Sequence, residues 1–450
     1  MSVEPDVAAP DLEDATENAA SASSPVVSGV PLVLLTAVMA VDQADRYLLS
    51  AVFPLVKEEF GLSDTQLGSL SAAFLLVVSL GAVPLGVLVD RRVRTHIAAW
   101  GCALWSLAMI ATGLASSYVT LFLARMGLGI AEASYTPASF SLLGDSYPPE
   151  QRGRALGIYQ VGSILGFLGL PIGGLIAATW GWRVAFHVYA ISGFLLAVLL
   201  WHMREPARGA VDRGLSAVSA PGPRQAPSRY ALMSGFAPFR YLLSIPTVTV
   251  SLLTHALAVF FTSGLGIWAT TYLVRFHDLS IPQATAATSL LAVGAIVGAL
   301  LGGYLGDAAV QRGQVAGRIY VAAAAPVLGV VLLVPAFATD STPLMLVLFA
   351  LGAVTLTMPN APLAALRADV VHPDLRGRAA SLVALLSAGA AASSPLLFGV
   401  LSDDYGLRAA FLATLPFMGL GGVLLFLLGP RHVATDRARM RRQLVEEESA

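Results

Sequence analysis

Charge is scarce in this chain. Asp, Glu, Lys and Arg make up 12% of its 450 residues, hydrophobic residues make up 56%, and the mean hydropathy is +0.73. A soluble domain carries about 25% charged residues, so most of the surface of this protein cannot face water. The apolar residues also occur in long runs, which are typical of transmembrane helices. The composition excludes a soluble globular protein and predicts an all-α membrane protein.

Cysteine is almost absent as well, and this excludes several kinds of chemistry. The single cysteine, Cys102, lies in an apolar run, so neither a disulfide framework nor a cysteine metal site can form. The seven histidines show no metal-ligand spacing, and the chain has no phosphate-binding loop and no basic run interleaved with aromatic residues. We therefore expect no catalytic residue, no metal, no cofactor and no nucleic-acid partner.

Twelve apolar runs remain when the chain is divided at charges, prolines and glycines, and each is long enough to cross a bilayer. A polar, proline-containing stretch separates the first six from the last six. The expected spans are 29–56, 64–89, 96–116, 118–144, 154–179, 183–203, 243–274, 281–309, 316–337, 342–366, 378–402 and 407–429.

These spans divide the chain into five segments. The first 28 residues contain six acidic residues and no Lys or Arg, and their Ala-, Ser- and Pro-rich composition predicts disorder. The expected organisation is an acidic cytoplasmic tail at 1–28, a six-helix bundle at 29–203, a cytoplasmic linker at 204–240, a second six-helix bundle at 241–429 and a basic cytoplasmic tail at 430–450.

The distribution of Lys and Arg predicts the orientation in the membrane. Of the 27 basic residues, 21 fall in segments on the same side as the linker, and four (Lys57, Arg183, Arg275 and Arg408) fall on the other. Cytoplasmic loops carry an excess of basic residues. We expect a monomeric, multi-pass protein of the inner (plasma) membrane, with both termini in the cytoplasm and the basic tail near anionic membrane lipids.

Short motifs recur in the two halves at nearly constant offsets. Three matches occur in the same order along each half, which indicates an internal repeat and two pseudo-symmetric six-helix bundles. Two parallel repeats around a central site are common among alternating-access transporters. The matched segments are 86–90 with 303–307, 152–155 with 376–379, and 181–186 with 406–411.

The motifs resemble those of the major facilitator superfamily. The run Gly86–Arg94 reads G-x-L-x-D-R-x-x-R and is similar to the signature loop between helices 2 and 3 of that superfamily. Its diluted copy, Gly303–Asp307, stands where the superfamily has a second one. Arg125-x-x-x-Gly129 resembles the helix 4 motif. The resemblance implies the major facilitator fold with twelve transmembrane helices.

Three further motifs resemble the Spinster-type branch of that superfamily. They are Asp45-Arg46-Tyr47, the pair Arg125 and Glu132 followed by Pro137, and Arg204-Glu205-Pro206-Ala207-Arg208. The branch carries lysophospholipids and sphingoid lipids, so the resemblance implies a lipid or other amphiphilic small molecule as the substrate.

Five ionisable residues lie inside the first and fourth spans. On a helix, Asp42, Asp45 and Arg46 fall within one polar stripe, and Arg125 and Glu132 are two turns apart on one face. A charge at the bilayer centre costs about 2.5–3.5 kcal/mol on insertion scales, so such residues are candidates for function. The family resemblance implies that both helices face the central cavity.

We interpret these charges as a proton-coupled substrate site. Asp45, Glu132 and Asp42 are the candidate proton-coupling carboxylates, because an Arg that pairs with an acid in only one state changes its proton affinity. Arg46 and Arg125 suit an anionic phosphate, which a guanidinium can bind with two hydrogen bonds. The predicted substrate site consists of Arg46, Arg125, Glu132, Tyr47, His255 and Trp268.

Structural interpretations stand beside the functional ones. The interior charges could form a static ion-pair network that joins two helices, and water at the cavity mouth could solvate Asp42. His255 in the seventh span could titrate or could simply pack. Trp268 could instead be an interface anchor.

Charges at the cytoplasmic ends of the spans suggest an inside gate whose ion pairs hold one conformation. Solvated helix ends would look similar. The candidate gate residues are Asp90, Arg91, Arg94, Glu150, Arg152 and Arg154.

Our leading hypothesis is a proton-coupled secondary transporter of lysophospholipids or related single-chain amphiphiles. Drug efflux or transport of small organic anions is the alternative within the superfamily. An uncoupled lipid scramblase or a membrane sensor is the alternative from another class. A proton gradient separates these hypotheses, since only the coupled transporters respond to it.

Overall fold

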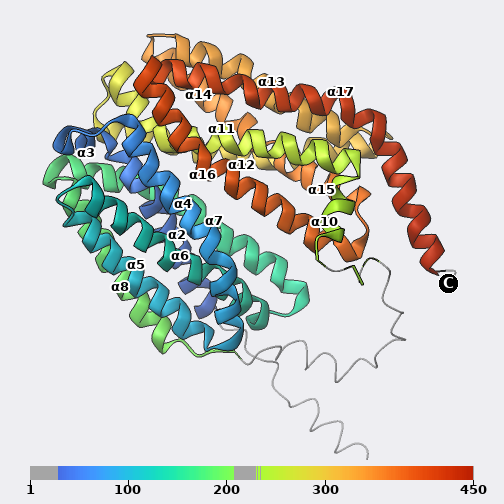
Figure 1. Cartoon of the computed structure of the whole chain (residues 1–450), viewed down its shortest axis with the longest axis horizontal. Coiled ribbons are helices and arrows are strands. Elements are labelled where there is room, and N and C mark those ends of the chain that lie inside the picture. The colour runs from blue at the N-terminus through green and yellow to red at the C-terminus, as the bar shows by residue number, and fades with distance from the viewer. Residues whose placement is uncertain (1–28, 207–229, 231, 234, 449–450) are drawn as a thin grey trace, which may run out of the picture.

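The computed structural model describes residues 29–206, 230, 232–233 and 235–448 (Figure 1). Within these ranges the elements are helices, and no strand occurs. The predicted acidic tail at 1–28 and most of the predicted linker lie outside the described residues, as do the side chains of Asp90 and Glu150. The helices of the described ranges confirm the prediction of an all-α membrane protein.

The described part of the N-terminal half contains seven helices, of which the first two form one span. α3 begins after a break at Val52, where Pro54 occupies the first turn of the new helix and cannot donate a backbone hydrogen bond. The helices are α2 (Val30–Ala51), α3 (Phe53–Phe60), α4 (Asp64–Arg91), α5 (Arg94–Gly113), α6 (Tyr118–Ser146), α7 (Pro149–Trp180) and α8 (Trp182–His202).

The C-terminal half repeats this plan with two additions. A short helix lies within the predicted linker, and the last helix continues to Glu448 through the predicted basic tail. Pro359 divides the tenth span into two helices. The helices are α10 (Ala237–Leu243), α11 (Pro246–His277), α12 (Ile281–Gln311), α13 (Gly317–Ala338), α14 (Thr342–Thr357), α15 (Asn360–Val370), α16 (Arg376–Tyr405) and α17 (Leu407–Glu448), with a single 3-10 turn at Pro373–Leu375.

All twelve expected spans correspond to helices. Ten of the described spans are long and apolar enough to cross a membrane by length and composition alone. The other two are α2 and α6, the helices that carry the interior charges. Charge lowers their mean hydropathy, and packing inside the N-terminal bundle compensates for it.

The C-terminal extension of α17 packs on its own half. The buried carboxylate of Asp436 accepts a hydrogen bond of 3.1 Å from the backbone N–H of Thr247, in the first turn of α11. Gln443 donates to the Tyr241 hydroxyl over 3.0 Å. The N-terminus of α11 thus gains an acceptor for one of its unpaired N–H groups and a favourable negative charge.

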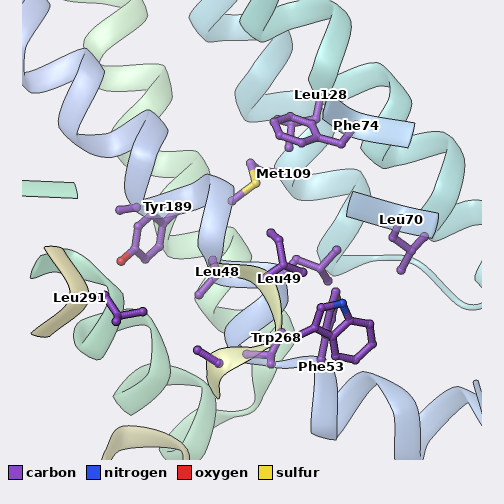
Figure 2. Close-up of a cluster of buried hydrophobic side chains, with 14 of the residues drawn as sticks. Leu48, Leu49, Phe53, Leu70, Phe74, Met109, Leu128, Tyr189, Trp268 and Leu291 are labelled. Atoms are coloured by element: carbon purple, nitrogen blue, oxygen red, sulfur yellow. The ribbon is translucent and has the colours of Figure 1, made fainter. Parts of the chain in front are cut away.

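The two halves meet at one end of the molecule and diverge toward the other (Figure 1). At the closed end, the start of α4 packs so tightly against the end of α16 that a Cβ on Gly399 would lie 2.4 Å from the Asp64 carbonyl oxygen. Phe53 and Trp268 also meet there, with ring centroids 5.3 Å apart, next to Leu49 (Figure 2). The end of α8 and α10, between which the predicted linker runs in sequence, lie at the opposite end, called the linker end below.

Gly399→Val should weaken this closed end. Its side chain would clash with the backbone of α4, and overpacking of this kind costs about 1–3 kcal/mol. The population should shift toward a conformation in which this end opens and the linker end closes. Spin labels at Gln151 on α7 and Gln311 on α12, both exposed at the linker end, should then give shorter distances.

Gly389→Val is the matched control, because it lies on the same helix with nothing near its Cβ position. That variant should leave the distances unchanged. If Gly399→Val also leaves them unchanged, the packing of α4 on α16 does not govern which end is open.

Candidate functional site

An ion pair inside the N-terminal bundle joins α2 to α6. The Arg46 guanidinium donates to the Glu132 carboxylate over 2.9 Å and lies 3.7 Å from the Asp42 carboxylate one turn earlier. Glu132 and Asp42 are buried, whereas a quarter of the Arg46 side chain stays exposed. Arg46 also lies over the ring of Phe74, 5.5 Å from its centroid. The structure thus brings together three of the residues that the sequence singled out.

Two aromatic side chains donate hydrogen bonds to the interior acids Asp42 and Asp45. Tyr135 on α6 donates a hydrogen bond of 2.6 Å to Asp42. Trp105 on α5 donates its indole N–H to Asp45, which is fully buried. The sequence analysis missed both donors. Tyr135 carries a possible signal, since it follows Glu132 by three residues and shares its face of the helix, but nothing in the sequence marks Trp105.

Arg125 is the second buried cation of the site. Its guanidinium lies over the Phe186 ring on α8, 5.0 Å from the centroid, in a cation–π contact. Among the described residues, its Nε and Nη2 atoms find no hydrogen-bond partner, and the same holds for one oxygen each of Asp42, Asp45 and Glu132. The cluster therefore retains both donors and acceptors for a proton or a ligand.

A cavity of about 270 Å³ opens beside this cluster, between the two halves. From the N-terminal half it is lined by Arg46, Tyr47 and Arg125, and from the C-terminal half by Thr262, Ser263, Thr357 and Asn360. Apolar side chains from both halves complete its wall. We call this cavity the polar chamber, because its two guanidinium groups suit an anionic group.

A second cavity of about 370 Å³ adjoins the first across Tyr47, which lines both. It lies between α2 and α7 on one side and α11, α12 and α14 on the other. Its wall is mostly apolar and includes Phe167, Leu265, Leu291 and Ile296. The Tyr47 ring packs at a tilt against Phe167, with centroids 4.3 Å apart. Tyr47, Thr262, Leu356 and Thr357 line both cavities, so the polar chamber and the apolar one share a common border.

Three predicted substrate residues do not line these cavities. Glu132 contacts the polar chamber only through its ion pair with Arg46. Trp268 is fully buried at the closed end, where its indole N–H donates to the Pro395 carbonyl over 3.1 Å. His255 is half-buried on α11, one turn from Ala258 and Val259 in the polar chamber. Its Nδ1 has no hydrogen-bond partner among the described residues.

Arg94 is the centre of the charge network at the linker end. Its fully buried guanidinium binds Asp145 on α6, and it donates to Glu205 over 3.0 Å and to the Pro206 carbonyl over 2.7 Å. Burial raises the pKa of Glu205, but the hydrogen bonds and charge of Arg94 outweigh it and hold that pKa below its ordinary value of 4.5. This network lies within one half.

The other predicted gate residues lie outside the hydrogen-bond network of Arg94. Arg152 donates to the Tyr147 carbonyl over 3.0 Å, and Arg91 and Arg154 are exposed. The side chains of Asp90 and Glu150 lie outside the described part of the chain. Whether these residues form a gate between the halves stays a prediction.

An ion-pair cluster at the closed end was not predicted. Asp64, at the start of α4, is buried and accepts from Lys57 over 2.6 Å, from Arg275 over 2.6 and 2.7 Å, and from Ser402. Asp403 in turn accepts from the backbone N–H groups of Asp64 and Thr65, each over 2.8 Å. These bonds connect the two halves at the end opposite the linker.

The family model of the Major Facilitator Superfamily matches residues 35–383 and 278–446. The chain therefore belongs to the Major Facilitator Superfamily. Within it, the chain is of the Spinster type, an integral membrane protein with multiple spans. Mouse protein spinster homolog 3 is 30% identical over 441 residues, which cover 88% of this chain and 81% of the mouse protein.

A solved structure agrees with this assignment. A bacterial homolog of the human lysosomal transporter Spinster, in an inward-facing and unoccupied conformation, superimposes with a TM-score of 0.79 at 24% identity and covers 92% of this chain and 99% of that one. At that identity the likeness shows the fold. The twelve-span, two-bundle architecture is thereby confirmed.

Other relatives are similar over a shorter stretch. The probable L-galactonate transporter of Escherichia coli K12 is 26% identical over 289 residues, 63% of this chain and 62% of that protein. Human protein spinster homolog 1 is 29% identical over 56% of this chain and 47% of its own length. The matched stretch thus spans about half to two thirds of these relatives, which include sugar-acid and Spinster-type carriers.

Glu205→Gln should lower thermal stability near neutral pH by about 1 kcal/mol or less, since this ion pair is partly solvated. The pKa of Glu205 is depressed in the folded state, so its contribution is complete above the ordinary value of 4.5 and is lost as pH falls through the depressed value. Melting curves of wild type and variant should therefore differ near neutral pH and converge in acid.

Glu58→Gln, at an exposed position on α3, is the control and should not change melting at either pH. A difference between Glu205→Gln and wild type that is as large in acid as at neutral pH would contradict the ion-pair interpretation.

Proposed function

We propose that this protein is a proton-coupled secondary transporter of lysophospholipids or related single-chain amphiphiles, acting as a monomer by alternating access. The observation that carries the proposal is the pair of adjoining cavities that share Tyr47. One carries two guanidinium groups together with hydroxyl and amide groups among its apolar side chains, and the wall of the other is mostly apolar. An amphiphile has the same division of chemistry, with an anionic headgroup at one end and a hydrocarbon chain at the other.

The polar chamber suits a phosphate-containing headgroup. Arg46 and Arg125 both line it, and a guanidinium can hold phosphate with two parallel hydrogen bonds. The unpaired Nε and Nη2 of Arg125 are available without breaking an existing bond. Binding an anion to Arg46 would compete with Glu132 for the same guanidinium.

That competition supplies a route to proton coupling. If Asp42, Asp45 and Glu132 are all ionised, three negative charges face the two positive charges of Arg46 and Arg125, and the low-dielectric interior penalises the surplus. One proton on a carboxyl neutralises it. An anionic headgroup that draws Arg46 away from Glu132 would make a proton on Glu132 more favourable still, so cargo and proton would bind cooperatively.

The apolar chamber suits the hydrocarbon chain. Its wall of Phe167, Leu265, Leu291 and Ile296 would shield an acyl chain from water, which stabilises binding by about 0.8 kcal/mol for each buried CH₂ group. Gln43, Gln160 and Ser163 lie on the α2 and α7 side. The chamber is therefore not uniformly apolar and could admit a glycerol backbone near Tyr47.

The side of the membrane that each end faces follows if the linker and both termini are cytoplasmic. The closed end, with Asp64 and Arg275, then faces outward, and the conformation described is inward-facing. Opening outward would require the ion pairs of Asp64 and the bonds of Asp403 to break. A compensating contact at the linker end would use the predicted gate residues.

Glu132→Gln should abolish the response of transport to a pH gradient. The amide cannot be ionised, so it cannot exchange a proton between the two states. In proteoliposomes, uptake of labelled lysophosphatidylglycerol by the wild type should increase severalfold under a pH gradient, whereas the variant should show the same rate with and without it.

Glu58→Gln again serves as the matched control and should retain the pH response. If wild-type transport is indifferent to the gradient, proton coupling fails and an uncoupled scramblase becomes the better explanation. If the lysolipid does not move at all, the substrate proposal fails.

Ala295→Phe should shorten the longest acyl chain that is transported. Ala295 lines the apolar chamber, and a phenyl ring would fill part of its volume. Transport of lysolipids with long chains should fall severalfold, while short-chain analogues should be carried nearly as well as by the wild type.

Val293→Phe, two residues earlier on the exposed face of α12, is the control and should not alter chain-length selectivity. An equal loss for all chain lengths in Ala295→Phe would indicate that the apolar chamber does not hold the chain.

Transport of a small organic anion is the second candidate function. It is favoured by the similarity to the probable L-galactonate transporter and by the hydroxyl-bearing wall of the polar chamber, Thr262, Ser263 and Thr357. The same proteoliposomes, loaded with labelled sugar acids, separate the two. Movement of a sugar acid without movement of the lysolipid would establish the second candidate.

A further inference from the structure

A third cavity, of about 220 Å³, lies between α15 and α16. Among the described residues, two arginines, Arg367 on α15 and Arg376 on α16, are the charged groups that line it, and no described carboxylate does so. Small apolar side chains form the rest of its wall. These are Ala364, Ala368, Val371, Ala379, Ala380 and Val383.

This cavity lies on the same two helices as part of the polar chamber, nearer the linker end. Asn360 on α15 and Ala391 on α16 line the polar chamber. On α15, Asn360, Ala364 and Arg367 are spaced by four and three residues and therefore share one face of the helix. The same pair of helices thus carries the central chamber near the middle of the molecule and the third cavity nearer the linker.

No described residue compensates the charge of Arg367. Its Nη1 atom is buried and has no hydrogen-bond partner, and it forms no ion pair with a described carboxylate. The nearby Arg318 differs, since it binds both Asp307 and Asp369. A partly buried cation without a partner is costly and strongly favours an anion beside it.

Arg376 is held at the same cavity. Its Nη2 donates to the backbone carbonyl of Ala368 over 3.0 Å. Its Nε and Nη1 atoms take no part in that hydrogen bond. Two guanidinium groups at one small cavity provide several N–H donors, and the Ala and Val side chains of its wall offer no acceptor for them. Planar guanidinium donors match the oxygens of phosphate and carboxylate.

We propose that the cavity between α15 and α16 binds an oxyanion, either a phosphate or a carboxylate group, at a second site between the linker end and the central chamber. Arg367 would bind the oxyanion and Arg376 would close the site from the linker side. An anionic cargo would pause there on its way to or from Arg46 and Arg125. The site would serve a lysolipid and a small organic anion equally, so the inference does not depend on which cargo is carried.

Thiol labelling tests the site directly. The only native cysteine, Cys102, is buried, so a cysteine introduced at the exposed Ala364 in the wall of this cavity would be the reporting thiol. The full chain with Ala364→Cys would be placed in phosphatidylcholine nanodiscs and labelled with an uncharged maleimide. Dodecyl phosphate should slow the labelling severalfold, and dodecyl maltoside, which carries no charge, should not.

Arg367→Gln should remove this protection, and Arg367→Lys should retain part of it. Arg312→Gln is the matched control, because Arg312 is exposed at the same end of the half but outside the cavity. Size-exclusion and melting profiles show whether each variant is folded. Because labelling reports binding without transport, this result is independent of the outcome of the proteoliposome experiments.

Two further arms identify the source of the oxyanion. Protection by inorganic phosphate alone would support a site for a free anion, and protection by phosphatidylglycerol in the nanodisc would support a site for a membrane-lipid headgroup. The proposal is overturned if no anion slows the labelling, or if Arg367→Gln is protected as well as the wild type.

Discussion

The low dielectric of the membrane interior is the constraint on which the rest of this structure depends. A charge inside a bilayer needs a partner, and the N-terminal bundle provides partners by packing α2 against α6. The Arg46–Glu132 ion pair, the cation–π contact of Arg125 and the two aromatic donors to Asp42 and Asp45 all serve this need. The same helices therefore lie inside the bundle and border the polar chamber.

The sequence predicts the spans and the charged residues because both depend on local patterns. Apolar runs mark the helices, and Asp45 or Glu132 stands out against an uncharged background. The contacts of these residues could not be predicted, because they depend on how distant helices pack. Trp105 is one of several aromatic residues in apolar helices, and Arg275, which binds Asp64, lies 211 positions further along the chain.

The two halves share a plan but differ in chemistry. The N-terminal half concentrates its interior charge in one paired cluster, while the C-terminal half supplies much of the apolar wall and the Arg367 guanidinium, which has no ion pair among the described residues. Repeat symmetry explains the matched helices and loop motifs. It does not explain this difference in charge between the halves, on which the proposed separation of proton exchange from binding of the hydrocarbon chain depends.

The location of the charge cluster has an electrical consequence. Asp42, Asp45, Arg46, Arg125 and Glu132 all belong to α2 and α6, so they would move as one body in the proposed rocking of the halves. Their charges would not separate from one another, and with one proton on the three acids the cluster is neutral, so its movement would carry no charge through the membrane voltage. The voltage dependence of the cycle would then be set by the net charge of the cargo and its proton, and a monoanion carried with one proton would move without current.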